Sequence, residues 1–298
     1  MSKEDKLHAF NDILGRWSQE EHAAFWDESG RAILDYDLLL RMLSVPVSDG
    51  DAVQSGRFAG ALDLWIAHEL ERAGFAEESV WPRQVEPRAV DPTVLRAISG
   101  AKELSAPVLE GILKQSGARS ESVVMGSVYA KQVDVGMSTW PSGPELLVST
   151  KTMGGSFGKN LANRFEEAYG DVKNLRARYP LAAHGFFFLA NATILDEPSA
   201  FSKAVHMLCQ LSKDADVYDA VALLIVDWGH GISSEDGGVL PSLALAPQAW
   251  EHVPKELAPE RFFEKLCDIV LRNSPIDMHQ RARALRNGPG RGTLEFDG

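Results

Sequence analysis

Two polar residues in the middle of the chain have types and spacing that suit chemistry on a phosphate. Asp134 in KQVDVGMS and Lys151 in LLVSTKT stand on consecutive predicted strands. A hairpin that pairs these strands brings a carboxylate and an ammonium group to one end of a sheet. Carboxylate oxygens are ligands for hard cations such as Mg²⁺, and a neighbouring lysine can orient the attacking water. The pattern is typical of phosphodiester hydrolysis.

A single aspartate is a poor metal site, and the residue two positions before Lys151 is Ser149 rather than an acid. Glu166 and Glu167, on the helix predicted to leave this strand, are the natural suppliers of a second carboxylate. At about 100° per residue, the two glutamates lie off the apolar stripe of that helix, on opposite flanks. The sequence does not choose between them.

The segment before these glutamates admits other interpretations. A P-loop needs four residues between its first glycine and its Gly-Lys-Ser/Thr end. Gly154 and Gly158 are separated by only three residues, and Asn160 stands at the hydroxyl position, so a P-loop is disfavoured. Lys159 and Asn160 either meet a phosphate together with a helix N-terminus or serve as turn and capping residues. Arg164 either contacts a phosphate or forms an ordinary helix ion pair.

Alternating and helical patterns predict the elements that hold these residues. Residues 123–139 and 145–153 are predicted strands, joined by the turn WPSGP into a hairpin or meander. An apolar stripe predicts a helix from Ser156 to about Tyr179. The runs AAHGFFFLAN and DAVALLIVDWG predict buried strands, with a helix near AFSKAVHMLCQLSK between them.

Helical patterns flank this central region on both sides. The segment GRFAGALDLWIAHELERAGF predicts a helix ended by Gly74, residues 94–117 predict a second helical region, and PERFFEKLCDIVLRN predicts a late amphipathic helix. We therefore expect a helical N-terminal region (1–120), a nuclease-like α/β core (121–230), and a C-terminal helical region with a basic tail (231–298). Glu69, on the first helix, could add a carboxylate to the site, but an exposed surface position is expected for it.

The composition limits the class of protein. The chain has 298 residues and 45% hydrophobic residues, with no apolar run near the roughly 20 residues of a membrane span. The N-terminus resembles neither a secretory signal nor a transit peptide, which predicts a cytoplasmic location. Cys209 and Cys267 stand in apolar helical patterns and are expected to be reduced, buried thiols.

Charge limits the class of partner. A net charge of −12 argues against nonspecific adhesion to DNA but leaves room for a local basic cleft. The arginines between positions 272 and 291 form either a solvated helix end and tail or a phosphate contact.

The order of an aspartate, a strand with x-x-Lys, a helix and a strand resembles the PD-(D/E)XK nuclease superfamily. More specifically, STKTMGGSFGKNLANRFEEAYGDVKNLRARYPLAAHGFFFLAN resembles the XhoI-like type II restriction endonucleases. In that family a Glu-Phe-Lys strand end runs into a Ser-Phe-Gly-Asn-Asn segment, an Asn-Arg-x-Glu-Glu-Ala helix and an apolar strand. The overlap covers residues 134–191.

Residue by residue, Lys151 falls on the family lysine and Asp134 on its first metal-binding aspartate. The agreement continues through the loop and helix at Ser156, Phe157, Gly158, Asn160, Asn163, Arg164, Glu166, Glu167 and Ala168. Ser149 departs from the pattern, because the family has an acid there. Other restriction enzymes of the superfamily carry Ser-x-Lys and take the metal-binding glutamate from the following helix, at much the spacing that separates Lys151 from Glu166.

The resemblance implies a restriction-endonuclease-like core, a mixed sheet flanked by helices, and Mg²⁺-dependent, site-specific cleavage of double-stranded DNA. It implies that Asp134 and Glu166 or Glu167 bind the metal, and that Lys151 orients the water while Ser149 occupies the vacated acid position. The residues implied to contact DNA phosphates are Lys159, Asn160, Asn163 and Arg164. A palindromic target would call for a twofold homodimer. The rival interpretation, favoured by Ser149 and the acidic charge, is a noncatalytic DNA-binding or defence-complex subunit on the same fold.

Overall fold

The computed structural model describes residues 7–17, 23–84, 88–89, 100, 107, 111, 122–228, 232–233, 239–240, 243–246 and 251–288. In this part of the chain a six-stranded sheet has the order β1-β4-β5-β6-β7-β10. The strands are β1 (Val80–Trp81), β4 (Val135–Thr139), β5 (Gly143–Met153), β6 (Ala183–Asn191), β7 (Ala220–Asp227) and β10 (Ala244–Leu245). β5, β6 and β7 run parallel, and the other neighbours pair antiparallel. The fold is therefore α/β with a mixed sheet, as predicted.

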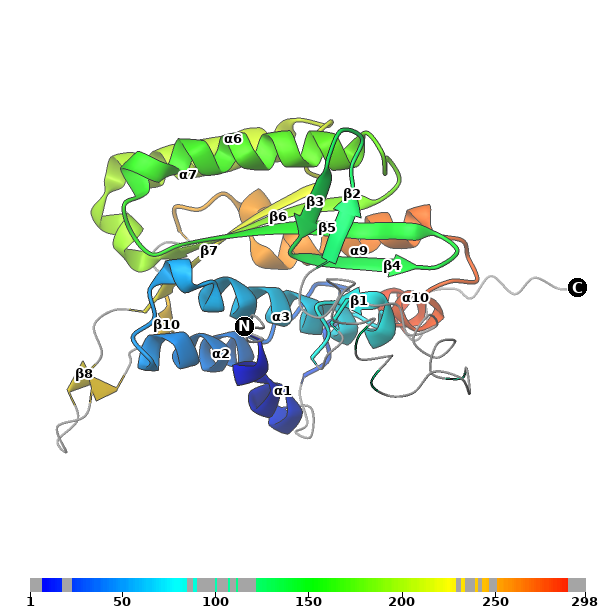
Figure 1. Cartoon of the computed structure of the whole chain (residues 1–298), viewed down its shortest axis with the longest axis horizontal. Helices are drawn as coiled ribbons and strands as arrows, with labels where there is room; N and C mark the ends of the chain where they lie inside the picture. The colour runs from blue at the N-terminus through cyan, green and yellow to red at the C-terminus, as the bar shows by residue number, and fades with distance from the viewer. Residues whose placement is uncertain are drawn as a thin grey trace, which may run out of the picture.

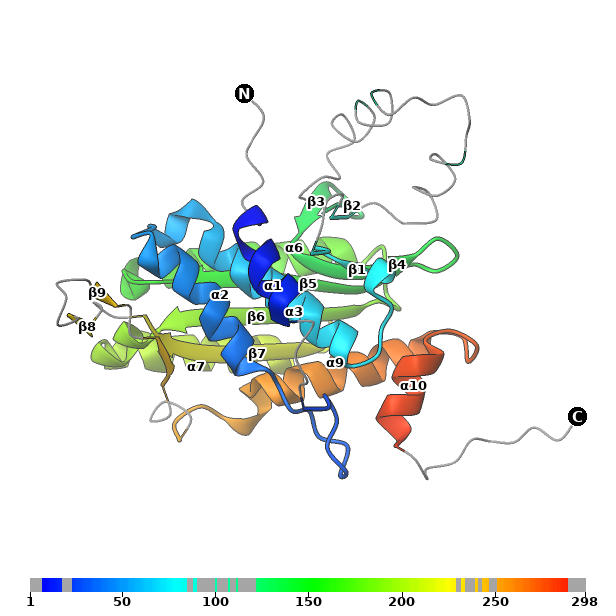
Figure 2. The ribbon, with the colours of Figure 1, turned by 90° about the horizontal axis from the view of Figure 1, so that it is seen from below.

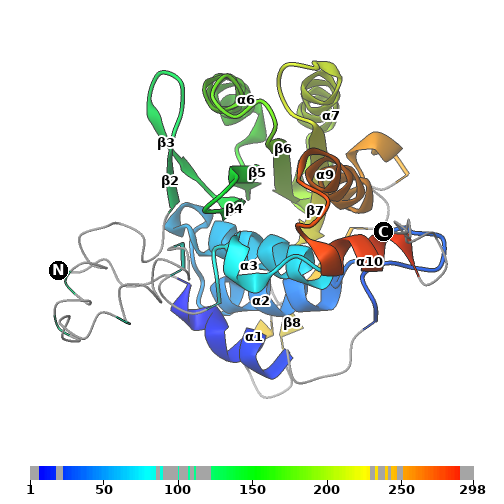
Figure 3. The same ribbon diagram turned by 90° about the vertical axis from the view of Figure 1, so that its right-hand side faces the viewer.

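Helices connect the parallel strands. α6 (Phe157–Arg176) joins β5 to β6, and α7 (Pro198–Lys213) joins β6 to β7. Two right-handed crossovers that proceed in the same direction place both helices on the same face of the sheet, and Figure 3 shows them together on that face. β6 is buried at all nine positions, as its continuous apolar sequence predicts for a central parallel strand.

On the opposite face of the sheet, α3 (Arg57–Arg72) packs against β1, β4 and β5. α2 (Tyr36–Ser48) packs on α3, and α1 (Asn11–Trp17) packs on α2 (Figures 1 and 2). α9 (Pro259–Asn273) lies along β6 and β7. Apolar residues of these helices form one hydrophobic cluster with the sheet, which runs from Leu7 to Ala282. The predicted N-terminal, central and C-terminal regions thus contribute to a common core.

Residues 123–139, which we predicted as one strand, are divided into three. β2 (Ser122–Met125) and β3 (Ala130–Val133) form a separate two-stranded sheet, and the chain then enters β4 of the main sheet. Gly126 and Ser127 are turn-forming residues that interrupt the alternation, and Asp134 is the bend between β3 and β4. A third, two-stranded sheet pairs β8 (Ile232–Ser233) with β9 (Val239–Leu240).

The end of α3, the two cysteines and the flanking segments were also predicted. α3 ends as predicted, since Gly74 adopts the left-handed φ of 108° that glycine tolerates best. Cys267 is buried, Cys209 is half-buried, and both are free thiols. Apart from residues 100, 107 and 111, the helical region predicted at 94–117 lies outside the described residues, as does the basic tail from position 289.

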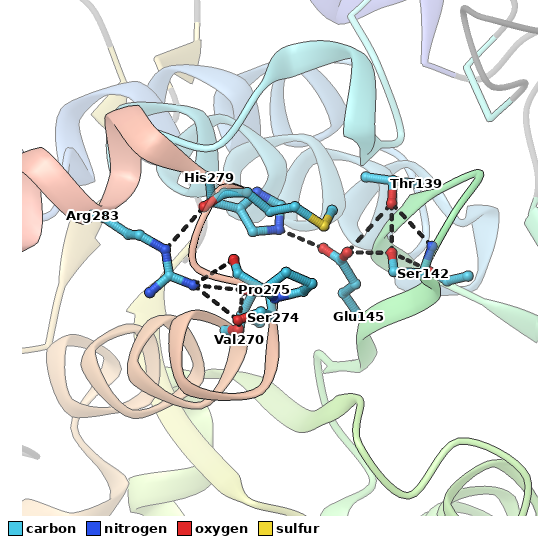
Figure 4. A network of polar contacts seen from close by, with 10 residues as sticks. Thr139, Ser142, Glu145, Val270, Ser274, Pro275, His279 and Arg283 are labelled. Atoms are coloured by element: carbon cyan, nitrogen blue, oxygen red, sulfur yellow. Dashed lines mark hydrogen bonds and ion pairs between the residues drawn. The ribbon is translucent and has the colours of Figure 1, made fainter. Parts of the chain in front are cut away.

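A polar network ties the start of β5 to the connection between α9 and α10 (Gln280–Asn287), as Figure 4 shows. Nε2 of His279 lies 2.6 Å from Oε2 of Glu145, and both side chains are buried. Arg283 donates hydrogen bonds to three backbone carbonyl groups of the connection, and Arg286 pairs with Asp268 at 2.7 Å. These two arginines of the basic C-terminal stretch are therefore engaged within the protein.

Candidate active site

A cleft of about 520 Å³ opens where β5 ends and α6 begins. Asp134 and Lys151 both line it, so the structure brings together the two residues that strand spacing predicted. The other residues of its wall are Val53, Ala59, Thr150, Thr152, Met153, Gly154, Gly155, Ser156, Asn160 and Arg164. The cleft therefore combines an acid, two basic side chains and several hydroxyl and amide groups.

Asp134 is held in place by β5. Its Oδ2 atom accepts a hydrogen bond of 2.9 Å from the backbone N–H of Thr150. Burial raises the pKa of Asp134, and the charge of Lys151 and the bond from Thr150 only partly oppose this rise. Asp134 is therefore a carboxyl group in a poorly solvated position, where a cation would stabilise its ionised form.

A second carboxyl group, Asp63 of α3, lies behind the cleft wall rather than in it. Oδ1 of Asp63 accepts a hydrogen bond of 2.6 Å from the hydroxyl of Thr150. Burial raises the pKa of Asp63 well above its ordinary value, and the adjacent Asp134 carboxylate raises it further. Lys151 acts in the opposite direction on both acids. A second carboxyl group thus interacts with Asp134, from a helix that precedes the sheet in the sequence.

Asp63 was not among the predicted site residues, although its sequence neighbours carried a signal. Leu62 and Leu64 flank it, and Ile66 follows nearly one helical turn later, so this acid stands among buried apolar residues. An exposed position would not need such neighbours. We considered Glu69 of the same helix instead and expected it to be exposed.

Glu69 is not exposed. Its relative accessibility is 0%, and it pairs with Arg72 at 2.5 Å while accepting the Asp35 N–H at 3.0 Å. It therefore joins α3 to the chain segment before α2, which explains a buried glutamate without a catalytic role.

The residues of the cleft fit a hard divalent cation. Asp63 and Asp134 each have one carboxylate oxygen that receives no hydrogen bond from the described residues. The buried hydroxyl oxygen of Thr152, in the same wall, also has no partner there. No group of three or more acidic, histidine or cysteine side chains that could hold a metal occurs in the described part of the chain. A cation between two carboxylates would complete its shell with water and substrate oxygens, as Mg²⁺ commonly does.

Glu166 and Glu167 occupy a different place from Asp63. Both are exposed on α6, and neither belongs to the cleft wall. Oε2 of Glu167 accepts a hydrogen bond of 3.1 Å from Nη1 of Arg164, which does line the cleft. Within the described residues, Glu167 is thus linked to the site through Arg164, and the metal-binding role of either glutamate stays a prediction.

Ser149, at the position of the family's acid, is engaged on the α6 face of the sheet. Burial raises the pKa of the Tyr218 hydroxyl, and the Ser149 hydroxyl acts on it in the opposite direction. Tyr218 donates a hydrogen bond of 2.9 Å to the carbonyl oxygen of Ala168. Ser149 is not part of the cleft wall.

The four predicted phosphate-contacting residues separate into three groups. Asn160 and Arg164 line the cleft beside Lys151. Asn163 is exposed on α6 and does not line it. The side chain of Lys159 lies outside the described residues.

The glycine pair before α6 has a packing explanation. A Cβ atom on Gly154 would come within 2.4 Å of the Val53 side chain, so a larger residue would push β5 away from the segment before α3. Gly155 faces open space. Close packing therefore accounts for Gly154 without a P-loop, in line with the defective spacing.

Comparison of the chain with protein-family models, curated proteins and solved structures gives no significant match. None of the helices in the described ranges has the length and apolar character needed to cross a membrane.

Proposed function

We propose that the protein is a Mg²⁺-dependent endonuclease that hydrolyses phosphodiester bonds of double-stranded DNA. The observation that carries this proposal is that Asp134 and Lys151 line one cleft, with the buried carboxyl group of Asp63 bonded to Thr150 of the cleft wall. Two carboxylates can hold a divalent cation, and a lysine beside them can position an attacking water. Arg164 in the same wall adds a positive group for a phosphate.

The topology supports a restriction-endonuclease-like core. Asp134 stands at the entrance to β4, Lys151 lies near the end of its antiparallel neighbour β5, and α6 then leads to the parallel strand β6. This is the order on which the resemblance to PD-(D/E)XK nucleases rests. The narrower function that we propose is a site-specific type II restriction enzyme or related phage-defence nuclease. It would act in the cytoplasm, as a homodimer if its target is palindromic.

Each residue has a defined part in this proposal. Asp63 and Asp134 hold the cation through the carboxylate oxygens that lack hydrogen-bond donors. A bound Mg²⁺ would supply positive charge next to the phosphate oxygens. Lys151 orients the attacking water, and Asn160 and Arg164 hold the DNA backbone. Glu166 and Glu167 are the alternative suppliers of a second carboxylate.

The second candidate function is a noncatalytic DNA-binding or defence-complex subunit. The observation that favours it is that Ser149 stands where an acid is expected and does not line the cleft. The net charge of −12 points the same way. In that case the cleft would bind a DNA backbone without cutting it.

The test is to incubate the purified protein with unmethylated phage DNA and Mg²⁺, with an EDTA control and a Lys151→Ala variant. Discrete fragments that require Mg²⁺ and disappear with the variant would support the nuclease. DNA binding without cleavage, across several DNAs, would favour the noncatalytic subunit. Neither binding nor cleavage would contradict both functions.

A further inference from the structure

Asp134 is the point at which the chain passes from one sheet to another. β3 pairs with β2 in the small sheet, and β4 pairs with β1 and β5 in the main sheet. The bend between them contains the carboxyl group that faces the cleft. A bend residue is positioned by the strands on both of its sides, so the position of Asp134 depends on what holds the β2–β3 hairpin.

α6 holds the turn of this hairpin through Asn174. Oδ1 of Asn174 accepts hydrogen bonds from the N–H groups of Val128 and Tyr129 at 2.8 and 3.2 Å, and its Nδ2 donates to the Tyr129 carbonyl at 2.9 Å. A Cβ atom on Gly126 would come within 2.1 Å of the Asn174 side chain. The close approach therefore requires glycine at this position of the turn.

One turn before Asn174, Asp171 of the same helix holds β3 itself. It pairs with Nζ of Lys131 at 2.5 Å and accepts a hydrogen bond of 3.1 Å from the Tyr129 hydroxyl. The side chains of Lys131 and Asp171 are only 29% and 12% exposed, so water screens this pair less than a surface ion pair. Lys131 stands in β3 only three residues before Asp134, so the pair holds the strand that leads into the bend.

We infer that Lys131 is a positioning residue, whose ion pair with Asp171 fixes β3 against α6 and thereby holds the Asp134 carboxylate at the cleft. α6 starts directly after the strand that carries Lys151, so one rigid helix sets the relative position of the two cleft residues. The importance of this positioning for cleavage rests on the proposed function. The position of Asp134 itself can be measured without any activity.

The amide hydrogen of Thr150 reports that position, because it is bonded to the Asp134 carboxylate. Its exchange with solvent can be followed by NMR in the metal-free protein, with the Phe188 amide in β6 as internal reference. We expect Lys131→Met and Asp171→Asn to speed exchange at Thr150 about tenfold relative to Phe188. Lys131→Arg should largely restore protection. The control is Lys173→Met, which breaks an exposed ion pair of α6 with Asp216.

Cleavage assays separate the inference from the proposed function. If the wild-type protein cleaves DNA, Lys131→Met should raise the Mg²⁺ concentration for half-maximal rate at least tenfold and leave the KM for DNA unchanged. Unchanged cleavage in that variant would overturn the role in catalysis. If the wild-type protein does not cleave, the proposed function fails and the exchange data alone decide. If the Thr150 amide of Lys131→Met exchanges as slowly as it does in the wild-type protein, the inference is overturned in either case.

Discussion

The carboxyl groups of Asp63 and Asp134 share one donor residue, Thr150. Its hydroxyl binds Asp63 at 2.6 Å and its backbone N–H binds Asp134 at 2.9 Å. Each acid then keeps one oxygen without a donor among the described residues. A single position of β5 thus aligns an acid from a helix with an acid from a strand bend. We propose that the free oxygens of the two acids bind one cation.

Lys151→Met should abolish DNA cleavage but retain affinity for Mn²⁺, which serves as a probe for Mg²⁺. Cleavage is lost because Lys151 orients the attacking water. Mn²⁺ affinity is retained because the substitution removes a positive charge that acts on both Asp63 and Asp134, so their electrostatic attraction for a cation does not fall. Isothermal titration calorimetry with Mn²⁺ measures the affinity. Lys173→Met is the matched control. Loss of Mn²⁺ binding in Lys151→Met would contradict a water-orienting role that is separate from the metal.

Gly126→Ala should destabilise the protein by about 1–3 kcal/mol, because the added Cβ atom overlaps the Asn174 side chain that holds the β2–β3 turn. Gly170→Ala is the matched control on α6. Its Cβ meets nothing within 4 Å, so we expect a gain of about 0.5–1 kcal/mol from helix propensity. Urea denaturation gives both values. Equal effects of the two substitutions would show that the contact with Asn174 does not limit the turn.

Glu71→Gln should stabilise the protein at alkaline pH and have little effect at pH 4. Burial and, to a lesser extent, Glu77 raise the pKa of Glu71 from 4.5 to about 8. Between these values the folded protein keeps a proton that the unfolded chain has lost, so the stability that protonated Glu71 contributes declines as pH rises from 4.5 to 8. We expect the Tm of the variant to exceed that of the wild type by about 2–4 °C at pH 9. A difference in Tm between variant and wild type that grows toward low pH would contradict a raised pKa for Glu71.

Part of the site was predictable because it is local in sequence. Asp134 and Lys151 lie on strands that pair as neighbours, so alternation and the WPSGP turn were enough to bring them to one cleft. The central helix and the buried strands β6 and β7 were predictable for the same reason. Each has its own periodicity, and right-handed crossovers leave few ways to connect parallel strands.

Asp63 was not predictable in this way, because nothing local relates α3 to the end of β5. Its place depends on how a helix packs across the sheet, and the only sequence signal was an acid within an apolar helical face. The metal-binding role of Glu166 or Glu167 stays a prediction. Helical geometry placed them on the flanks of α6, but the packing of α6 on the sheet decides which flank faces the cleft, and it leaves both exposed. The bend at Asp134 likewise depends on the attachment of a hairpin to a distant turn of α6.

The most direct test of the account is DNA cleavage and Mn²⁺ binding by Asp63→Asn, compared with Asp134→Asn and with Asp216→Asn. The side chain of Asp216 is 86% exposed, so its substitution controls for the loss of one carboxylate. We predict that the first two variants lose Mg²⁺-dependent cleavage and at least tenfold in Mn²⁺ affinity while they remain folded, and that the control matches the wild type. Wild-type cleavage and Mn²⁺ affinity in Asp63→Asn would contradict the site proposed here.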